Sequence, residues 1–516
     1  MKIRLFAAIL AAALSLAMLT GCGDNGDTDA TTTTTAETTT TAEATTTTEE
    51  EETSTSVQQD ETTGSKKSTT TKKETTKATT TTKVTYRTVN KTTTTSEQAP
   101  TTGTVVDVTE PTTVTTTKKT PPSRTKVTTT TFKKITPTMT PEEAAKKVTH
   151  VDGKVFAKIP NDTAAVTTFN KEWAFTHHPG VAVFKGKIYA MFSQHETGED
   201  FPGQRLAVAS SDNFFDWSEP KVVIDAFDGT YTYNGVKAKV SIIPCGLYVA
   251  NGKLFATGMA HDYGPVMFDS NGKFKGGGDD FVGNTTSWMS YTEDGVNWSE
   301  PVKCGALVND SLRQTYFGRW LCVSGTRFYY TDKEPDGFFW EASQHDDQQL
   351  QRIRERIKNH TPKPSNPIFT ESSWYHTKDN VIFMMSRTNA GVMYLSQSYD
   401  GGETWTEAYP TNFSSSNNQF PMGELPDGRI YAIGTPYNKS NQWEQWPLNI
   451  YISEDGYNFD KAYTISDERY NLKQAGYSKG GCFGYPRVTM DDQYLYVLHS
   501  KQKEVMEIHR IKIADL

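Results

Sequence analysis

The sequence predicts an all-β fold, a six-bladed β-propeller that follows a signal peptide and a disordered linker. The first observation is a short acidic turn motif that occurs four times after residue 200, most clearly as Ser398 to Trp405. The second is a set of six similar strand–turn–strand units between residues 179 and 500. A hairpin module repeated at intervals is typical of a propeller, in which each blade is a four-stranded sheet.

The chain opens with a secretion signal. A basic start precedes an apolar, alanine-rich run from Leu5 to Met18, which is too short to favour a membrane span. The next four residues, Leu19-Thr20-Gly21-Cys22, form a lipobox. We therefore predict a lipoprotein signal peptide over 1–21, a lipid on Cys22, and a protein anchored to the extracellular face of the cell membrane.

Residues 22–140 are predicted to be a disordered linker. They consist of threonine runs broken by Glu, Lys, Ser and Pro, with almost no large apolar side chains. Such a segment buries too little surface to offset the entropy lost on ordering. We expect it to act as a stalk between the anchor and the following domain.

Residues 145–516 are predicted to form the propeller domain. This region is rich in Tyr, Trp, Phe and Gly, and its length suits one large all-β domain. The chain has a net charge of −8, which gives no reason to expect nucleic-acid binding. We expect a monomer. Four cysteines follow Cys22 at irregular spacing, which favours buried thiols and leaves one disulfide open: Cys245, Cys304, Cys322 and Cys482.

Six units supply the blades, and each opens with a strand, turns at Gly or Asp and returns as a second strand. They are Pro179–Ser193, Ile242–Met259, Tyr316–Tyr330, Ser372–Ser386, Phe420–Gly434 and Pro486–Ser500. The sixth unit ends in a further strand at residues 505–513, and we expect residues 154–159 to add its outermost strand and close the ring. Residues 346–359 carry apolar side chains at helical spacing and predict a helix in the third blade.

Four units continue into the turn motif, whose pattern is S-x-D-x-G-x-x-W. Besides Ser398–Trp405, the copies are Ser210–Trp217, Tyr291–Trp298 and Ile452–Phe459. Phe214 replaces the glycine in one copy, and Glu293 and Glu454 take the acidic position in the last two. The acid is expected to accept backbone N–H bonds, the glycine to supply a positive φ, and the aromatic side chain to pack under the loop.

The residues that flank the six units are expected to surround one mouth of the propeller, on the face opposite the acidic turns. They are unusually polar, and a concave mouth of this kind suits a polar ligand. The candidates for this mouth are His177, His178, Gln194, His195, Glu196, His261, Asp262, Glu371, Arg387, Gln419, Tyr485 and Arg487.

On its turn motifs, the chain resembles the Asp-box (BNR repeat) propellers of the sialidase (neuraminidase) superfamily. That family uses a Tyr nucleophile activated by a Glu, three Arg that grip a carboxylate, and an Asp acid/base. The resemblance implies that Tyr485 is the nucleophile, that Glu371 is its base, and that Arg387 binds the substrate. It therefore implies a glycoside hydrolase.

Three positions depart from that family. His177 stands where the first Arg is expected, Gln194 stands in place of the acid/base Asp, and the third Arg is missing before Leu448. The arginine cage for a carboxylate is not intact, which makes sialic acid doubtful as the substrate. The acid role can pass to Glu196, with Glu199, Asp200 and Asp262 as alternatives, while His177 and His178 join the catalytic group.

Two other functions remain open. The histidines suit a polysaccharide lyase, in which His and Tyr remove the C5 proton of a uronic acid. The degraded site also suits a surface protein that binds glycans without turnover, with tryptophans stacked on sugar faces: Trp173, Trp374, Trp443 and Trp446. No metal or cofactor is predicted, although Gly276–Asp280 offers a weak Ca²⁺ motif. The function we predict is a lipid-anchored, sialidase-like glycosidase that acts on an extracellular glycan.

Overall fold

β-Strands are the main secondary structure of the described residues. The computed structural model describes residues 133–276, 283–305, 310–324, 327–333, 335, 341–361 and 363–516. Its helices within these ranges are α2 (Pro141–Lys147), α3 (Asp347–Asn359) and the short turns η1 (Pro265–Met267) and η2 (Ile513–Asp515). No helix in the described ranges has the length and apolarity to cross a membrane. The all-β prediction is confirmed for this part of the chain.

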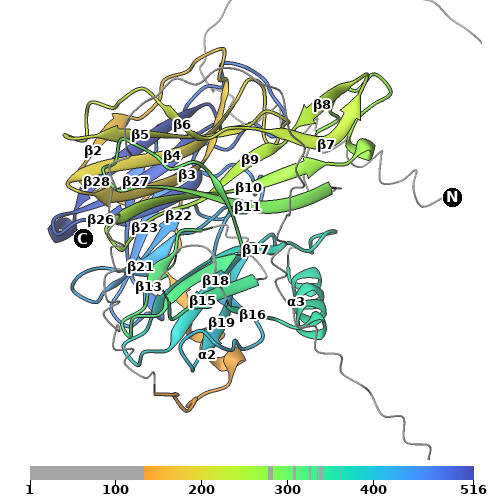
Figure 1. Ribbon diagram of the computed structural model, residues 1–516. Helices are drawn as coiled ribbons and strands as arrows, with labels where there is room; N and C mark the ends of the chain where they lie inside the picture. Colours follow the sequence, from red (N-terminus) through yellow and green to blue (C-terminus); the bar gives the residue numbers. More distant parts are fainter. Residues whose placement is uncertain are drawn as a thin grey trace, which may run out of the picture. The chain divides into compact units, whose positions relative to one another are not determined.

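The strands form sheets that follow one another along the chain (Figure 1). The first sheet contains β3 (Phe175–Phe184), β4 (Lys187–His195), β5 (Arg205–Ser211) and β6 (Lys221–Ile224). The second contains β9 (Ser241–Ala250), β10 (Lys253–Tyr263), β11 (Gly283–Thr292) and β12 (Val302–Cys304). The third contains β13 (Arg313–Gln314), β14 (Trp320–Ser324), β15 (Arg327–Thr331) and β16 (Glu341–Gln344).

The remaining sheets complete this series. The fourth contains β17 (Phe369–His376), β18 (Ile382–Thr388), β19 (Val392–Ser398) and β20 (Tyr409–Ser414), extended by β1 (Thr149–His150) and β24 (Asn458–Phe459). The fifth contains β21 (Met422–Glu424), β22 (Ile430–Gly434), β23 (Leu448–Ser453) and β25 (Lys461–Ser466). The last contains β26 (Gly484–Met490), β27 (Tyr494–Lys501), β28 (Val505–Lys512) and β2 (Asn161–Ala165).

This arrangement is propeller-like, but the described residues form a ring of five four-stranded blades and not the six that the sequence predicts. Five sheets have four strands, and the sheet that begins with β17 has six. The two additional strands arise because Thr149 pairs in parallel with both Asn412 and Asn458, which joins β1 to β20 and β24. A two-residue strand between two sheets left no apolar alternation in the sequence, so it was not predicted.

The core lies between sheets that are neighbours along the chain. One cluster combines Leu206 of the first sheet with Ile242 and Leu254 of the second. Another combines Leu498 of the last sheet with Ala190 of the first, so the last and first sheets also pack together. Sheets that each bury both faces against a neighbour need no further layer, which is how radial architectures protect their strands from water.

The four acidic turns connect the third and fourth strands of their sheets, as predicted. In the fourth sheet, Thr370 pairs with Arg387 at one end, whereas Ile382 pairs with Ser398 at the other end, where the turn begins. The turn therefore lies at the end of the blade opposite Arg387. The positive φ is present at Gly402 (φ 93°) and also at Phe214 (φ 76°), which takes the left-handed conformation without being glycine.

The predicted frame of three turns was wrong. The acceptors are Asp294 and Asp455, and not the preceding glutamates: Asp294 Oδ1 accepts the N–H groups of Val296 and Asn297 at 2.8 and 2.7 Å. In the copy at 210–217, Asn213 accepts the corresponding backbone N–H groups in place of Asp212. These three copies have one residue fewer between the acceptor and the aromatic residue than the copy at 398–405, and this shorter spacing misled the alignment.

The strand that completes the last sheet comes from upstream, as expected, but from different residues. It is β2, which pairs antiparallel with β28 from Asn161↔Ile511 to Ala165↔Glu507. In the predicted segment, Lys158 instead forms a parallel bridge with Thr464. β2 is a polar edge strand in which only Ala164 is buried, so it lacks the apolar alternation that marks an interior strand.

Two α-helices and one two-stranded ribbon lie outside the main sheets. The predicted helix at 346–359 is confirmed as α3, with Asp346 as its N-cap, and it stands beside β16–β18 (Figure 1). The helix α2 was not predicted; its Ala144 and Ala145 are fully buried in the core cluster of the fourth sheet. The ribbon of β7 (Asp228–Tyr233) and β8 (Val236–Lys239) extends beyond the sheets near β10.

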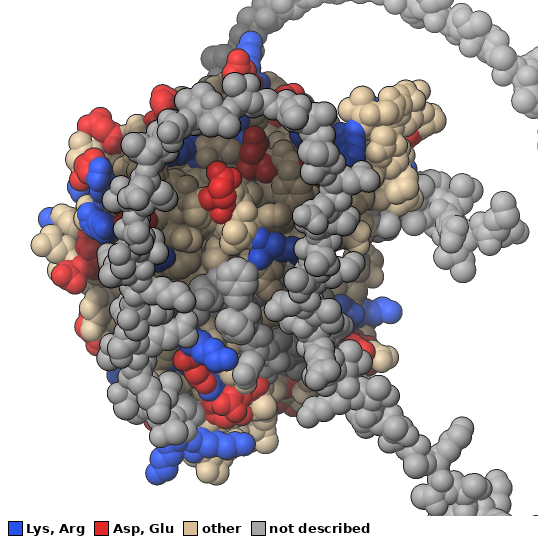
Figure 2. All heavy atoms as spheres, viewed as in Figure 1, with Lys and Arg blue, Asp and Glu red and all other residues tan. Residues whose placement is uncertain are grey.

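All four cysteines of the domain are buried free thiols: Cys245, Cys304, Cys322 and Cys482. The favoured interpretation of the sequence is thus confirmed. Burial raises the pKa of the Cys245 thiol to about 12. At the surface shown in Figure 2, Lys and Arg side chains lie beside Asp and Glu side chains, so the net negative charge does not gather into one acidic field on that face.

Candidate active site

Three first strands carry the same backbone irregularity, and each presents one candidate residue. His178 in β3, Glu371 in β17 and Tyr485 in β26 have φ of 52°, 44° and 49°. Each lies where the pairing with the second strand shifts register. A β-bulge re-aims a side chain, and left-handed non-glycine residues cluster at functional sites because the surrounding structure must hold them there. His178 and Tyr485 precede prolines, which favour extended backbone in the preceding residue, so the fold and not the local sequence imposes their left-handed conformation.

Tyr485, Glu371 and Arg387 form one hydrogen-bonded group. The Tyr485 hydroxyl donates to Glu371 Oε1 at 2.7 Å and accepts from Arg387 Nη1 at 3.0 Å. Arg387 Nη1 also pairs with Glu371 Oε2, and its Nε donates to Asn417 Oδ1 at 2.6 Å. The Tyr485 backbone N–H donates to Asn418 Oδ1 at 3.2 Å. The nucleophile, base and arginine inferred from the resemblance are therefore brought together from two sheets, the fourth and the last.

The electrostatics of this group keep the phenol protonated and the carboxyl ionised. Burial and the negative charge of Glu371 raise the pKa of Tyr485 well above its usual value. Burial by itself would raise the pKa of Glu371, but Arg387 and the hydrogen bond from Tyr485 outweigh it, and that pKa is lowered. A phenol that holds its proton next to an ionised carboxylate becomes a nucleophile only if the carboxylate takes the proton during attack.

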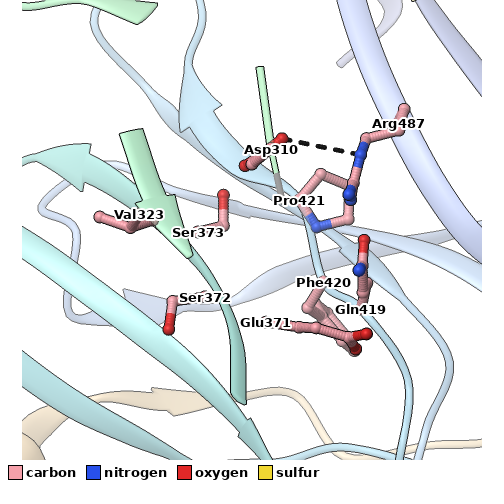
Figure 3. Close-up of a pocket in the computed structure, with 9 residues that line it drawn as sticks. All are labelled: Asp310, Val323, Glu371, Ser372, Ser373, Gln419, Phe420, Pro421 and Arg487. Atoms are coloured by element: carbon pink, nitrogen blue, oxygen red, sulfur yellow. Dashed lines mark ion pairs between the residues drawn. The ribbon is translucent and has the colours of Figure 1, made fainter. Parts of the chain in front are cut away.

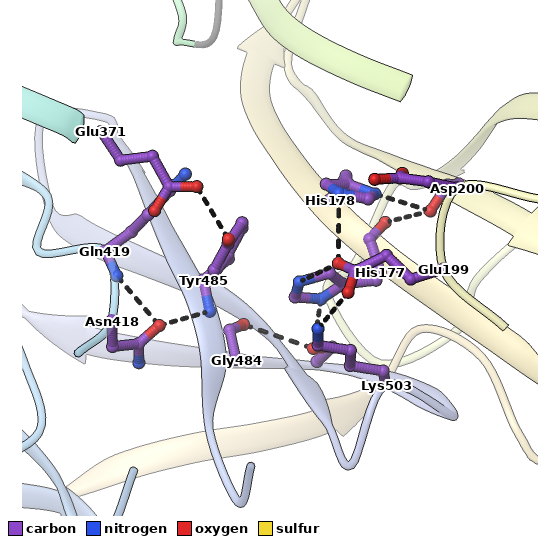
Figure 4. A network of polar contacts seen from close by, with 12 residues as sticks. His177, His178, Glu199, Asp200, Glu371, Asn418, Gln419, Gly484, Tyr485 and Lys503 are labelled. Carbon is purple, nitrogen blue, oxygen red and sulfur yellow. Dashed lines mark hydrogen bonds and ion pairs between the residues drawn. The ribbon is translucent and has the colours of Figure 1, made fainter. Parts of the chain in front are cut away.

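A second polar cluster lies on the other side of Tyr485 (Figure 4). The centroid of the fully buried His177 ring lies 4.4 Å from that of the Tyr485 ring, with the two planes tilted by 49°, and His177 Nδ1 lies 2.8 Å from Ser500 Oγ. Glu199 Oε1 lies 3.7 Å from His177 Nε2 and 3.5 Å from His178 Nε2. Lys503 Nζ pairs with the other oxygen of Glu199 at 2.6 Å.

The histidines of this cluster are held neutral. Burial and Lys503 lower the pKa of His178 to about 3, and the same causes lower that of His177. His178 Nδ1 donates to Ser193 Oγ, because the Ser193 hydroxyl itself donates to the His177 carbonyl. The His178 Nε2 lone pair therefore faces Glu199. Two imidazoles and a carboxylate could hold a metal ion, although the cation of Lys503 already neutralises Glu199.

Asp200 has the properties of a proton donor. Its Oδ1 is sealed from solvent and has no hydrogen-bond partner, and its backbone is left-handed at φ 58°. Burial and the neighbouring charge of Glu199 raise the pKa of Asp200 from 3.8 to about 7. A carboxyl group that is half protonated near neutral pH can donate its proton to a leaving group.

These groups open into one large cavity of about 1350 Å³. Of the predicted residues, it is lined by His178, His261, Glu371, Arg387, Gln419, Tyr485 and Arg487, and it also reaches Glu199 and Asp200. The volume exceeds that of a pocket for one small ligand, which suits a chain of several sugar units.

A small recess of the same mouth lies near the axis of the sheets. Figure 3 shows Gln419 between Glu371 and Arg487. A hydrogen bond from Gln419 contributes to the low pKa of Glu371. Arg487 Nε lies 3.6 Å from Asp310 Oδ1, so the charge of this arginine is also balanced by a carboxylate.

Five predicted residues are not among those that line the cavity, and one of them, His177, belongs to the cluster described above. Gln194 accepts hydrogen bonds from Arg205 at 3.3 and 3.1 Å, and the His195 ring accepts the backbone N–H of Thr197. Asp262 Oδ1 accepts the Thr230 N–H at 2.9 Å, and Glu196 is exposed outside the lining. The acid assigned to Glu196 is better matched by Asp200, which was one of the alternatives.

Lys503 was missed in the sequence. It follows β27 in the turn before β28 and was not among the residues predicted for the mouth. Lys503 lies three residues after the sixth unit, at the end that the sequence analysis assigns to the mouth, so a wider choice of flanking residues would have included it. Lys479 lies in the long connection between β25 and β26, outside the predicted units, and it also lines the cavity.

Of the four tryptophans predicted to stack on sugars, some pack against protein side chains and one lines the cavity. Trp443 lines the cavity. Trp374 is buried in the core, and the rings of Trp173 and Trp446 lie against Arg205 and Arg469. Of these four, only Trp443 is therefore placed to stack on a sugar in the cavity. The Ca²⁺ motif at Gly276–Asp280, the signal peptide with Cys22, and the linker up to residue 132 fall largely or wholly outside the described residues.

Comparison with known proteins gives the family. Residues 207–497 match the BNR repeat-like domain family, which is more than half of the chain. The chain belongs to the BNR repeat-like domain family. Its turns at 210–217, 291–298, 398–405 and 452–459 are the repeats expected of that family.

No curated protein matches the chain. Among solved structures, a sialidase superposes with a TM-score of 0.49 and 18% identity, over 71% of this chain and 35% of the other. The intramolecular trans-sialidase of Ruminococcus gnavus, in complex with oseltamivir carboxylate, superposes with a TM-score of 0.47 and 15% identity, over 67% of this chain and 98% of the other. Trypanosoma rangeli sialidase, in complex with sialic acid, superposes with a TM-score of 0.48 and 13% identity, over 70% of this chain and 60% of the other. The chain thus spans about a third of the first of these structures.

Proposed function

We propose that this protein is a glycoside hydrolase with Tyr485 as its nucleophile, acting on an extracellular glycan. The observation that carries this proposal is the hydrogen bond of 2.7 Å between the Tyr485 hydroxyl and Glu371 Oε1, inside a cavity of about 1350 Å³. A tyrosine that shares its proton with a buried, ionised carboxylate is an unusual arrangement for a purely structural pair.

In the first step, Tyr485 Oη attacks the anomeric carbon while its proton passes to Glu371. The bond from that carbon to the leaving oxygen breaks, and Asp200 gives its proton to this oxygen. In the second step, Asp200 takes a proton from water and the water oxygen bonds to the anomeric carbon. The bond between that carbon and Tyr485 Oη breaks, and the departing phenolate recovers the proton from Glu371. Retention of the anomeric configuration follows from two displacements.

Arg387 has a positioning role in this scheme. It pairs with Glu371 and donates to Tyr485, so it keeps both groups aligned and stabilises negative charge that develops on the phenol oxygen during departure of the sugar. Because its charge is already balanced, it is a poor anchor for a further carboxylate. The same holds for Arg487 beside Asp310 and for Lys503 beside Glu199.

We therefore propose a neutral or sparsely charged glycan as substrate, and not a sialic acid. A bidentate carboxylate site needs arginines whose charge is available to the ligand. The space of the cavity and the indole of Trp443 suit a sugar chain whose apolar faces stack on an aromatic ring. Membrane attachment through a lipid on Cys22 would place this site at the outer surface of the cell, with residues 22–140 as the stalk.

We also propose that the successive sheets close into one propeller-like ring, with β1 and β24 as accessory strands on the fourth sheet. The cluster shared by the last and first sheets supports this closure. Cys22→Ser tests the anchor separately: the variant should leave the membrane fraction and appear in the medium, whereas continued membrane association would argue against lipidation of this residue.

A lyase is the second candidate, because the His178 imidazole is neutral and lies beside Tyr485. In that reaction His178 takes the C5 proton of a uronic acid and Tyr485 protonates the leaving oxygen. The lyase product is unsaturated and absorbs in the ultraviolet, whereas the hydrolase product does not.

The test is a panel of neutral, uronic and sialylated glycans incubated with the full chain and with its Tyr485→Phe variant. The hydrolase predicts new reducing ends without ultraviolet absorbance, and no product from the variant. Unsaturated products would favour the lyase, and retention of a glycan without any product would show a binding protein. Cleavage of a sialoside would overturn the proposed neutral substrate.

A further inference from the structure

A compact group of metal-binding atoms lies in the last sheet, outside the cavity. His499 in β27 and Glu507 in β28 are cross-strand partners, and His509 lies two residues further along β28. His499 Nε2 lies 3.0 Å from His509 Nε2 and 3.6 Å from Glu507 Oε1, and His509 Nε2 lies 3.3 Å from the same oxygen. None of the three residues lines the cavity.

The neighbours of His509 fix which nitrogen carries its proton. The Asn161 amide nitrogen donates to the carbonyls of Ile159 and Ile465, both at 3.0 Å, so Asn161 Oδ1 must face His509. His509 Nδ1 lies 3.0 Å from this oxygen and therefore donates to it. In the neutral imidazole, the His509 Nε2 lone pair then points into the group.

The other two atoms also present lone pairs. His499 Nδ1 lies 3.4 Å from the Ser500 carbonyl, which can only accept, and this favours a lone pair on His499 Nε2. Glu507 Oε1 is buried without a hydrogen-bond partner. The lone pairs of three atoms thus converge. A single proton shared in a hydrogen bond would link only two of these atoms and leave the third without a partner. A cation at their centre would satisfy all three at once.

We propose that His499 Nε2, His509 Nε2 and Glu507 Oε1 bind one transition-metal ion, with zinc the best match. Zinc bonds to nitrogen and oxygen are about 2.0–2.2 Å, so the ligand atoms of a tetrahedral site lie about 3.3 Å apart. The three observed separations bracket this value. The bond from His509 Nδ1 to Asn161 is the kind of outer contact that orients metal-binding histidines.

The surroundings favour zinc over calcium or magnesium. Two imidazoles are poor ligands for hard cations, which prefer oxygen. Both histidines are buried, and Lys501 Nζ pairs with the other oxygen of Glu507 at 2.7 Å. This ammonium group opposes a nearby cation, so the site needs a metal that binds imidazole through strong directional bonds.

Such an ion would cross-link strands of the last sheet. His499 and His509 lie on the two middle strands of the last sheet, and Asn161 lies on β2, the strand supplied from the beginning of the domain. Metal binding here would tie the two ends of the domain together and add its binding free energy to folding. This inference does not depend on the proposed hydrolase activity.

The test measures zinc in the full chain, produced in zinc-supplemented medium and freed of loosely bound metal. We expect about one equivalent of zinc per chain, and a melting temperature that falls when a strong chelator removes it. The variants His499→Gln and His509→Gln should lose the metal and its chelator response. Glu507→Gln keeps both imidazoles and the shape of the side chain, and should lower zinc affinity at least tenfold.

Two variants serve as controls. His345→Gln replaces another buried histidine outside the group, and His178→Gln removes a ligand from the cluster at the cavity. Both should keep the zinc. Less than a tenth of an equivalent in the wild-type chain would overturn the proposal and leave the two imidazoles sharing a proton. Zinc that is lost only from His178→Gln would also overturn it, by placing the ion in the cavity.

Discussion

Replacing Tyr485 by phenylalanine removes one oxygen from the candidate site and leaves the ring in place. The lost hydroxyl donates to Glu371 at 2.7 Å and accepts from Arg387 at 3.0 Å. Hydrogen bonds to charged groups contribute about 1.5–3 kcal/mol each, but Glu371 and Arg387 keep each other as partners, so the total loss should lie near the lower value. We expect a melting temperature lower by about 2–5 °C.

The effect on turnover should be far larger than the effect on stability. Without a nucleophile, kcat should fall at least about 10³-fold, which corresponds to about 4 kcal/mol of activation free energy. The assay is release of reducing sugar from the glycan that the wild-type chain cleaves fastest, with melting followed by circular dichroism.

Tyr375→Phe is the matched control. Tyr375 is a buried tyrosine whose hydroxyl donates to the Gly456 carbonyl at 2.7 Å, in the acidic turn at 452–459. Its loss should cost about 1 kcal/mol of stability and leave turnover unchanged. If Tyr485→Phe keeps more than a tenth of wild-type turnover, Tyr485 is not the nucleophile and the reasoning fails.

Three further predictions concern the rest of the domain. Asp200→Asn should remove the alkaline limb of the pH–rate profile near pH 7. Because the pKa of Asp200 is about 7 in the folded protein and 3.8 as the reference, the stability of the wild-type chain should also fall relative to this variant as the pH rises from 3.8 to 7. Parallel profiles of the two proteins would contradict the assignment. Gly295→Ala should destabilise more than Gly252→Ala, since both glycines have positive φ but only the Cβ added at Gly295 would clash with a neighbour, the Tyr189 hydroxyl; equal melting temperatures would refute this. Glu504→Gln leaves the buried Lys479 ammonium without its carboxylate and should cost about 3–5 kcal/mol in chemical denaturation, whereas a loss below 1 kcal/mol would show that the pair is not needed.

The sequence was sufficient to predict the class of fold and the centre of the candidate site. Tyr485, Glu371 and Arg387 could be predicted because each flanks a strand whose pattern is clear, and flanking residues of successive blades meet at one mouth. The sequence did not show that Tyr485 and Glu371 have left-handed backbones. That conformation depends on bulges set by pairing with the next strand.

The errors arose where sequence position does not determine spatial position. Glu196 and Asp200 lie in the same loop, and only the path of that loop decides which carboxyl group reaches the cavity. β2 is a polar edge strand, so its five residues resemble a linker. His499 and His509 are buried on strands where an imidazole resembles any other inward-facing side chain. The convergence of their nitrogens requires the register between β27 and β28.

The central claim is that a sugar becomes bonded to Tyr485 during turnover. The most direct test is to quench the reaction of the full chain with acid during the first turnovers and to map the adduct by peptide mass spectrometry. The mechanism predicts the mass of one glycosyl unit on the peptide that contains Tyr485, and its absence in Tyr485→Phe. Turnover without any adduct at this residue, or an adduct on another side chain, would contradict the account.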